Sequence, residues 1–478
     1  MQEKLRLLLL CLLLLVISPA LVFSYARETK RDWDVCQHDT FGDVMRSGFN
    51  ASWQALLFHN HLLMRINQIY GFSWAFPTFE TIRYNVTTNW YWETGGGFLN
   101  NQFNHPYQGS QYFTAGRING FCYFSSLFFA ALGSYTWETM YATLRPSIND
   151  FITTAIGGPL VLGEILFRLY VEAYAAGVPL PLLLLINPLA GLTQFVTGWT
   201  PPDTGRHLYR LQFYFGSSFS RINYTVQGNQ QELFSFTGGT VNIGTRIIYG
   251  NPFFQETWVP FRHFEMAVSA GVNPLNPNEY VFLRFNGEGY VFAFSPIQTG
   301  TTAMSTGLAI HMDYFQMGEF EGAGSPNYST INLSSHALGW TTKYRNLFPR
   351  GTALDLRLHG GFTFFGITSF FCPEAERKFQ NYNYGISTRI VFGLERERRF
   401  RFDVNMYHFF FWTYPGTTAL SRGFVFAQFI DISYQHFVSA NISLGLTYSL
   451  SMEHGTFRGF PNTRKRDNTV KLFVAWNM

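Results

Sequence analysis

From about residue 205 to the C-terminus, apolar and polar residues alternate in stretches of about ten. Strands that face lipid on one side and a polar interior on the other have this pattern. The clearest stretches are "LDLRLHGGF" (354–362), "FRFDVNMY" (400–407), "NISLGLTYSLSM" (441–452) and "VKLFVAWNM" (470–478). The pattern predicts a transmembrane antiparallel β-barrel of about 12 strands, within 10–14.

The polar positions distinguish this barrel from the alternative, a soluble β-sandwich. A sandwich also alternates, but its outer faces carry charge rather than serine, glycine, asparagine and threonine. Breaks in the pattern predict the turns: Asn286-Gly287 as a tight hairpin, and "ERERR" (395–399) and "NTRKRDN" (462–468) as solvated turns or loops.

The first half of the chain has a helical period instead. Residues 110–144 predict one helix, and "INDFITTAIGGPLVLGEILFRLYVEAY" (148–174) predicts another, with Ser147 as its N-cap. Gly157-Gly158-Pro159 is expected to break or kink the second helix. The polar segment 101–110 is expected to form a turn that leads from a strand-like stretch, 84–97, into the first helix.

Ionisable residues in these apolar helices are candidates for a site. Asp150, Glu164 and Arg168 share one helical stripe, while Arg117 and Glu138 lie near the two ends of the preceding helix. Buried charges must pair, so we expect the five to converge into one buried network with His105 at its edge. Two interpretations stay open: the network joins helices to each other and to the barrel, or it forms a binding or catalytic site.

Composition supports a protein in contact with lipid. Charged residues make up 13% of the chain and aromatic residues 19%, and the net charge of +4 is small for 478 residues. We therefore expect no nucleic-acid partner. The apolar run after Lys4 and Arg6 predicts a signal peptide cleaved after Ala26, with an uncleaved anchor as the alternative.

Known catalytic and metal motifs are missing from the sequence. There is no Gly-x-Ser-x-Gly, His-Glu-x-x-His or phosphate-binding Gly-x-x-x-x-Gly-Lys, and catalytic residues stay unknown. The cysteines that follow the signal peptide, Cys36, Cys122 and Cys372, show no Cys-x-x-Cys spacing. We therefore expect no metal and no cofactor, and whether two of these cysteines pair is left open.

Four blocks in order, "NQFNHPYQGSQYFTAGRINGF", "GSYTWE", "PSINDFITTAIGG" and "LGE", resemble the motifs of the bacterial domain-of-unknown-function family 3943. The resemblance covers residues 85–170. It implies a cell-envelope protein of a diderm bacterium, with a barrel after the motifs and no established activity. It also adds Asn149 to the candidates, whereas Ala142 replaces a second acid of the motif. The full candidate set is His105, Arg117, Glu138, Asn149, Asp150, Glu164 and Arg168.

These observations predict four segments: a signal peptide (1–26), an N-terminal helical segment (27–84), a helical motif domain (85–200) and an outer-membrane barrel (201–478). The expected function is structural, or the transport or binding of a small or lipidic ligand. The alternative is an envelope enzyme that acts on a lipid or glycan with His105 and a carboxylate. Expected partners are outer-membrane lipid, the barrel-assembly machinery and a small-molecule or lipid ligand.

Overall fold

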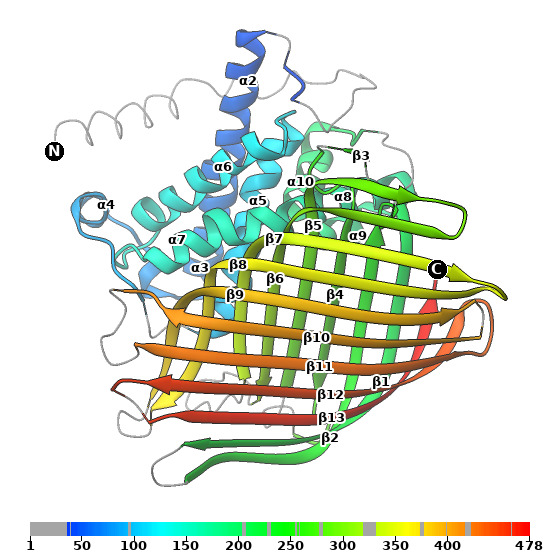
Figure 1. Cartoon of the computed structure of the whole chain (residues 1–478). Helices are drawn as coiled ribbons and strands as arrows, with labels where there is room; N and C mark the ends of the chain where they lie inside the picture. Colours follow the sequence, from blue (N-terminus) through cyan, green and yellow to red (C-terminus); the bar gives the residue numbers. More distant parts are fainter. Residues whose placement is uncertain are drawn as a thin grey trace. The chain divides into compact units, whose positions relative to one another are not determined.

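A computed structural model describes residues 36–478, except for 39, 94–96, 203–206, 227–230, 254–255, 258, 277–280, 319–330, 373–376, 398, 416–421 and 460. The chain divides into two compact units (Figure 1). A helical unit holds the residues up to Glu93 and Asn100–Arg206, and a barrel unit holds Thr94–Leu99 and His207–Met478. The predicted signal peptide lies outside the described residues.

Short helices interrupted by π-helical turns build the helical unit. In chain order they are α2 (Phe41–Ser52), η1 (Trp53–His59), α3 (Asn60–Ile69), η2 (Ser73–Ala75), α4 (Phe79–Thr87), η3 (Asn100–Asn104), α5 (His105–Ile118), α6 (Tyr123–Thr136), η4 (Trp137–Tyr141), α7 (Ile148–Ile152), η5 (Thr153–Gly157), η6 (Pro159–Gly163), α8 (Glu164–Ala175), α9 (Leu180–Ile186) and α10 (Pro188–Thr197). All are π- or α-helical except η2, which is a 3-10 turn. α5 lies at the centre of the unit, because most of its residues are buried.

α5 and the helical run that starts at α7 cross with their backbones in contact. A Cβ on Gly109 would lie 1.9 Å from the carbonyl oxygen of Thr154. One on Gly158 would lie 1.9 Å from the carbonyl oxygen of Pro106. Only glycine permits so close an approach. These two glycines therefore fix the crossing.

Two sequence predictions around this crossing are wrong. Segment 101–110 is helical rather than a turn, because Pro106 occupies the first turn of α5, where a missing N–H is tolerated. The described part of the stretch 84–97, which leaves out 94–96, is not a strand: α4 runs to Thr87, and Tyr91 makes one isolated bridge to Ser147. Packing against the helices determines the conformation of both segments.

The predicted helix over 110–144 is broken in the middle. Gly120 has a φ of 85°, a left-handed conformation that ends α5 and separates it from α6. Arg117 and Glu138 therefore lie on different helices.

The N-cap of the next helix is confirmed, since the Ser147 side chain accepts a hydrogen bond from the amide of Asp150. From there the run Ile148–Ala175 is continuous, because the π-helical turns η5 and η6 accommodate Pro159. Within the described residues, this is the one helix long and apolar enough to cross a membrane. As 72% of its apolar window is buried inside the protein, it has the character of a core helix.

The barrel is a closed antiparallel sheet. Its strands are β1 (Leu208–Val226), β2 (Gln231–Tyr249), β4 (Phe264–Val272), β5 (Val281–Gln298), β6 (Thr302–Gly318), β7 (Ile331–Phe348), β8 (Thr352–Cys372), β9 (Arg377–Arg396), β10 (Phe400–Thr413), β11 (Gly423–Phe437), β12 (Ile442–Phe457) and β13 (Thr463–Asn477). The short β3 (Glu256–Thr257) adds a bridge to β5. β1 pairs with β13, and β5 pairs with both β4 and β6, which closes the ring. The prediction of about 12 strands is confirmed.

The alternation along these strands is also confirmed. On β13, Leu472 and Trp476 point outward and are 60% and 51% exposed, whereas Phe473 and Ala475 between them are buried in the interior. β8 and β12 show the same division of exposed apolar and buried polar residues. An apolar outer face over so many strands is what a lipid-facing barrel needs.

Two predicted breaks lie inside strands instead. Asn286-Gly287 is in the middle of β5, where Asn286 points inward and donates to Asp313 at 2.6 Å. Residues 463–468 form the start of β13, where Lys465 points inward, is fully buried and pairs with Glu453 at 2.7 Å. In both cases an inward polar residue resembles a turn residue in the sequence. The turn predicted at 395–399 does connect β9 and β10, through 397–399.

The barrel has two ends. One holds the C-terminus and the last residues of β2, β5, β7, β9 and β11, and we call it the turn end because all these strands except β2 are joined to the next by three or four residues. The other, the loop end, holds the last residues of β1, β4, β6, β8, β10 and β12, which are joined to the next strand by 4 to 12 residues. β1 starts at the turn end.

Gly158→Ala is expected to destabilise the helical unit by at least about 1–3 kcal/mol, because the added methyl group meets backbone rather than a movable side chain. Gly48→Ala in α2 is the matched control: its Cβ would have an ordinary contact, 3.7 Å from Phe121, so stability should stay equal or rise. Thermal unfolding of the detergent-solubilised chain, followed by helical circular dichroism, measures both. Equal melting temperatures for the two variants would contradict the crossing.

Candidate functional site

The first group of candidate residues is an ion triad inside the helical unit. Arg117 pairs with Glu164 at 3.0 Å, and Arg168 pairs with the same carboxylate at 2.8 Å. Arg117 also donates to the carbonyl oxygen of Phe121 at 2.9 Å and stacks on the ring of Phe167. Glu164 is fully buried, and the two arginines are nearly so. The triad thus joins α5 to α8.

The second group is acidic and gathers where α7 meets η4 and the start of α5. Glu138 accepts a hydrogen bond from the amide of Ser147 at 2.9 Å, and Asn149 donates to Asp150 at 2.8 Å. His105 lies 4.0 Å from Asp150. The His105 and carboxylate of the enzyme alternative are therefore neighbours, and their catalytic role stays a prediction.

Burial controls protonation in this acidic group. It raises the pKa of Asp150 to about 6, and burial together with the charge of Asp150 raises the pKa of Glu93 to about 7. The same two causes raise the pKa of Glu138 well above its usual value. Burial lowers the pKa of His105 to about 4, so its imidazole is neutral at pH 7. Part of the acidic group therefore holds protons at neutral pH.

The predicted single network is wrong, because the two groups lie apart along one helix. Fourteen positions of one continuous helical run separate Asp150 from Glu164, roughly 20 Å along the axis at about 1.5 Å per residue. The π-helical turns η5 and η6 lie between them, so the α-helical spacing that predicted a shared stripe does not hold over this distance.

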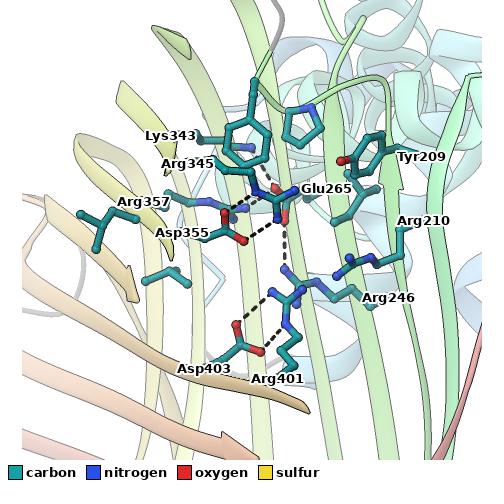
Figure 2. A pocket seen from close by; sticks show the side chains of 15 residues that line it. Tyr209, Arg210, Arg246, Glu265, Lys343, Arg345, Asp355, Arg357, Arg401 and Asp403 are labelled. Carbon is teal, nitrogen blue, oxygen red and sulfur yellow. Dashed lines mark hydrogen bonds and ion pairs between the residues drawn. The ribbon is translucent and has the colours of Figure 1, made fainter. Parts of the chain in front are cut away.

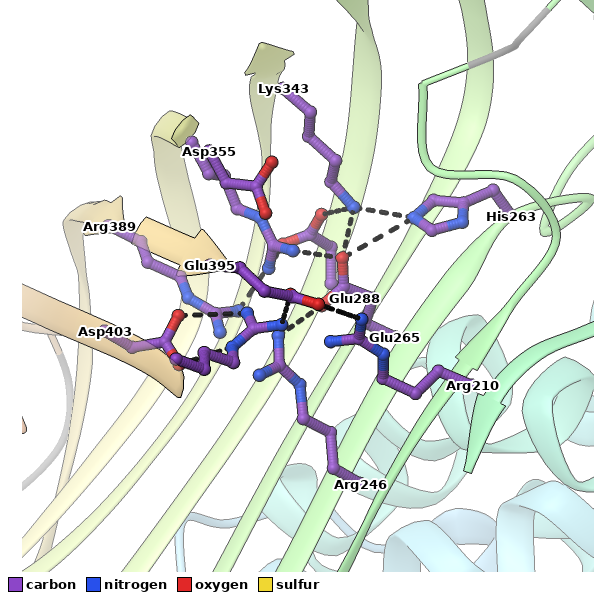
Figure 3. A network of polar contacts seen from close by, with 12 residues as sticks. Arg210, Arg246, His263, Glu265, Glu288, Lys343, Asp355, Arg389, Glu395 and Asp403 are labelled. Atoms are coloured by element: carbon purple, nitrogen blue, oxygen red, sulfur yellow. Dashed lines mark hydrogen bonds and ion pairs between the residues drawn. The ribbon is translucent and has the colours of Figure 1, made fainter. Parts of the chain in front are cut away.

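A third set of charges, which the sequence reasoning missed, lies inside the barrel (Figure 3). Two buried carboxylates form its centre, and Lys343 bridges them at 3.0 Å from Glu265 and 2.8 Å from Glu288. Arg357 contacts both carboxylates, and Arg389 approaches Glu288 at 3.5 Å. These side chains come from β4, β5, β7, β8 and β9, so the ion pairs cross the lumen.

Further ion pairs, drawn in Figure 2, extend this set, and Arg401 and Asp403 among them lie at the start of β10, near the turn end. Arg345 binds Asp355 through two nitrogens at 2.6 and 2.7 Å, and Arg401 binds Asp403 at 2.6 Å. Arg246 makes a longer contact, 3.5 Å from Glu265. We call the charged residues of Figures 2 and 3 the lumen network; they are Arg210, Arg246, Glu265, Glu288, Lys343, Arg345, Asp355, Arg357, Arg389, Glu395, Arg401 and Asp403.

Three cavities lie within or beside the lumen network, and among the side chains that line each cavity the cations outnumber the carboxylates. A cavity of about 50 Å³ is lined by six cations and three carboxylates, among them Arg246, Glu265 and Lys343. A larger one, of about 230 Å³, is lined by four cations and two carboxylates, among them Arg284, Asp431 and Lys471. The third, of about 280 Å³, opens near the C-terminus. Arg246 lines all three.

An apolar cluster fills the lumen on the other side of the 230 Å³ cavity. Along β10 the inward residues pass from Arg401 at the turn end, through Asn405, to Phe409 and Phe411 toward the loop end. The cluster is defined by Ile222, Phe236, Phe315, Met317, Ile331, Leu333, Tyr407, Phe409, Phe411, Val425, Ala427 and Phe429. Phe315 and Phe429 stack within it at 3.9 Å between ring centroids.

A sequence signal for the lumen network existed. Asp355, Arg357, Arg401 and Asp403 occupy polar positions of strands that the alternation identified correctly. Charged residues at inward positions, where serine or asparagine would satisfy the pattern, mark such a network. The alternation along one strand does not say which strands face each other across the lumen. The ion pairs could therefore not be predicted from the sequence.

Glu164→Gln should destabilise the helical unit by about 3–5 kcal/mol, because it leaves Arg117 and Arg168 buried without a carboxylate. Glu80→Gln, at an exposed position of α4, is the matched control and should change stability little. Denaturant unfolding followed by helical circular dichroism compares them. If both variants unfold like the parent, the triad contributes no stability.

The acidic group predicts a pH dependence above pH 6.5. Carboxyls with raised folded-state pKa values stabilise below their unfolded pKa and lose that contribution as pH rises through the folded value. The lowered pKa of His105 has the opposite effect, which is complete above its ordinary value of 6.5. The helical unit should therefore lose stability from pH 6.5 to about 8, by at most about 1.4 kcal/mol per pH unit and proton.

Glu138→Gln tests this dependence, because the amide oxygen can still accept from the Ser147 amide while the titrating group is gone. Melting temperatures at pH 6.5 and about pH 8 should differ less in this variant than in the parent or in Glu80→Gln. An unchanged difference would show that Glu138 is not protonated in the folded chain.

Comparisons with solved structures give low similarity to barrel proteins. The NanC porin has 9% identity and a TM-score of 0.24, over 54% of this chain and 98% of NanC. Omp33 of Acinetobacter baumannii has 9% identity and a TM-score of 0.23, over 56% of this chain and 99% of Omp33. The toluene transporter TodX of Pseudomonas putida has 9% identity and a TM-score of 0.22, over 56% of this chain and 89% of TodX. No curated protein matches the chain. Residues 89–177, which include every predicted site residue, match the family model described as Domain of unknown function (DUF3943).

Proposed function

We propose that this chain spans an outer membrane through its barrel and binds a small anionic solute in the lumen for gated passage. The membrane location rests on the closed sheet and its apolar outer face. All strands from β5 to β13 are longer than the 9–11 residues that cross a bilayer, so each reaches beyond the hydrocarbon region. By the usual arrangement of such barrels, the turn end faces the periplasm.

The observation that supports an anionic ligand is the basic lining of the three lumen cavities, which share Arg246. Most cations of the lumen network already hold carboxylates, but Arg246 contacts Glu265 only at 3.5 Å while lining all three cavities. On the wall of the 230 Å³ cavity, Lys471 lies over the ring of Tyr214 at 3.9 Å. An anion placed between these two cations would gain charge-assisted hydrogen bonds in a site of low dielectric.

The apolar cluster gives the proposal its gate. Aromatic side chains pack across the lumen between the 230 Å³ cavity and the loop end. Tyr407 belongs to the cluster and also lines the cavity, so a ligand in the cavity contacts the gate directly. Passage then requires rearrangement of this cluster, and a hydrophobic constriction of this kind excludes ions until it is wetted.

Arg246→Gln should weaken anion binding by roughly 10- to 100-fold, the effect of about 1.5–3 kcal/mol for a hydrogen bond to a charged group. It should also lower the anion preference of any conductance. Titration of the purified barrel with small carboxylates and phosphates measures the first, and reversal potentials in planar bilayers measure the second.

Arg464→Gln is the matched control, since this arginine lies exposed on β13 and outside the three cavity walls. It should leave both measurements unchanged. Cation-selective conductance in the parent chain, or equal anion affinity in all three proteins, would refute the proposed ligand class.

A further inference from the structure

Cys36 and Cys122 lie next to each other, although 86 positions separate them in the sequence. The Cys122 amide donates to the Cys36 sulfur at 3.3 Å. Both sulfurs contact the same hydroxyl, that of Ser125, at 3.7 Å for Cys36 and 3.3 Å for Cys122. Both are free thiols in the structure. The two sulfurs therefore share one small volume at the N-terminus of α6.

The residues that follow Cys36 also contact the loop that carries Cys122. Gln37 donates its amide to the carbonyl oxygen of Gly120 at 2.8 Å. His38 contacts the carbonyl oxygen of Asn119 at 3.2 Å, and its ring lies 4.4 Å from that of Phe121. Residues 36–38 are thus held along the 119–122 loop, and the loop presents Cys122 to Cys36.

Both thiols are also accessible enough to react with an oxidant. Cys36 is exposed and Cys122 is half-buried, so a protein oxidant can reach the pair. Buried structural thiols, in contrast, are inert.

We propose that Cys36 and Cys122 form an intramolecular disulfide in the exported protein. The inference rests on the export that the proposed function requires, because protein disulfides persist in the periplasm and are rare in the cytosol. One thiolate attacks the disulfide of an oxidised dithiol protein and forms a mixed disulfide. The second thiolate then displaces the oxidant, so that two protons and two electrons leave the pair and the oxidant becomes a dithiol.

The consequence is a covalent link between the segment before α2 and the start of α6. It closes a long loop that contains α2, α3, α4 and α5, and long loops gain the most from such closure. Unfolding of the central helix α5 would then produce a crosslinked chain with less conformational entropy, which stabilises the folded helix.

The test is thiol trapping in cells that produce the full chain. Cells are lysed under denaturing conditions with N-ethylmaleimide, and cysteine peptides are identified by mass spectrometry with and without prior reduction. The expected result is a linked Cys36–Cys122 peptide pair that reacts only after reduction, while Cys372 reacts in both samples. Full labelling of Cys36 and Cys122 without reductant, or a link from either to Cys372, would overturn the proposal.

Two serine variants separate the disulfide from other thiol effects. Reductant should lower the melting temperature of the parent and of Cys372→Ser, and should not change that of Cys36→Ser. In Cys36→Ser, Cys122 should become reactive without reduction. Cell fractionation of the same samples reports the location independently, so a failed membrane assignment is distinguishable from a failed disulfide.

Discussion

A backbone in lipid has no water to bond with, so each amide and carbonyl of a spanning sheet needs a partner within the sheet. In this chain the pairing of β1 with β13 and of β5 with β6 supplies those partners and removes both edges. Closure in turn divides every strand into an outward and an inward set of residues. The apolar outer face, the lumen network and the apolar cluster are all consequences of that division.

The inward set carries charge because it is enclosed by protein. Twelve charged side chains taken out of water would be costly alone, and the ion pairs of the lumen network offset much of that cost. Their order along the strands bears on the proposed passage: charges lie toward the turn end and aromatic rings toward the loop end, as β10 shows. A solute that enters from the turn end meets basic walls first and a hydrophobic barrier last.

Local pattern predicted the barrel well, because alternation repeats on every strand and each repeat has the same cause. It failed at Asn286-Gly287 and at segment 462–468, where polar residues face the lumen and look like turn residues. In the helical unit, the i,i+4 pair of Glu164 and Arg168 was predicted correctly, whereas the stripe that joined them to Asp150 assumed an α-helical spacing that the π-helical turns η5 and η6 interrupt. Contacts such as Lys343 with Glu265, or Cys36 with Cys122, join distant segments and leave no trace in a local pattern.

The helical unit meets the problem of burial in another way. Gly109 and Gly158 bring two backbones into contact at the crossing of α5 with the run that starts at α7. Near one side of it the carboxyls Glu138 and Asp150 have raised pKa values, and further along the same run Glu164 is held between two arginines. The first arrangement lowers the cost of burial by taking up protons, and the second by pairing with cations.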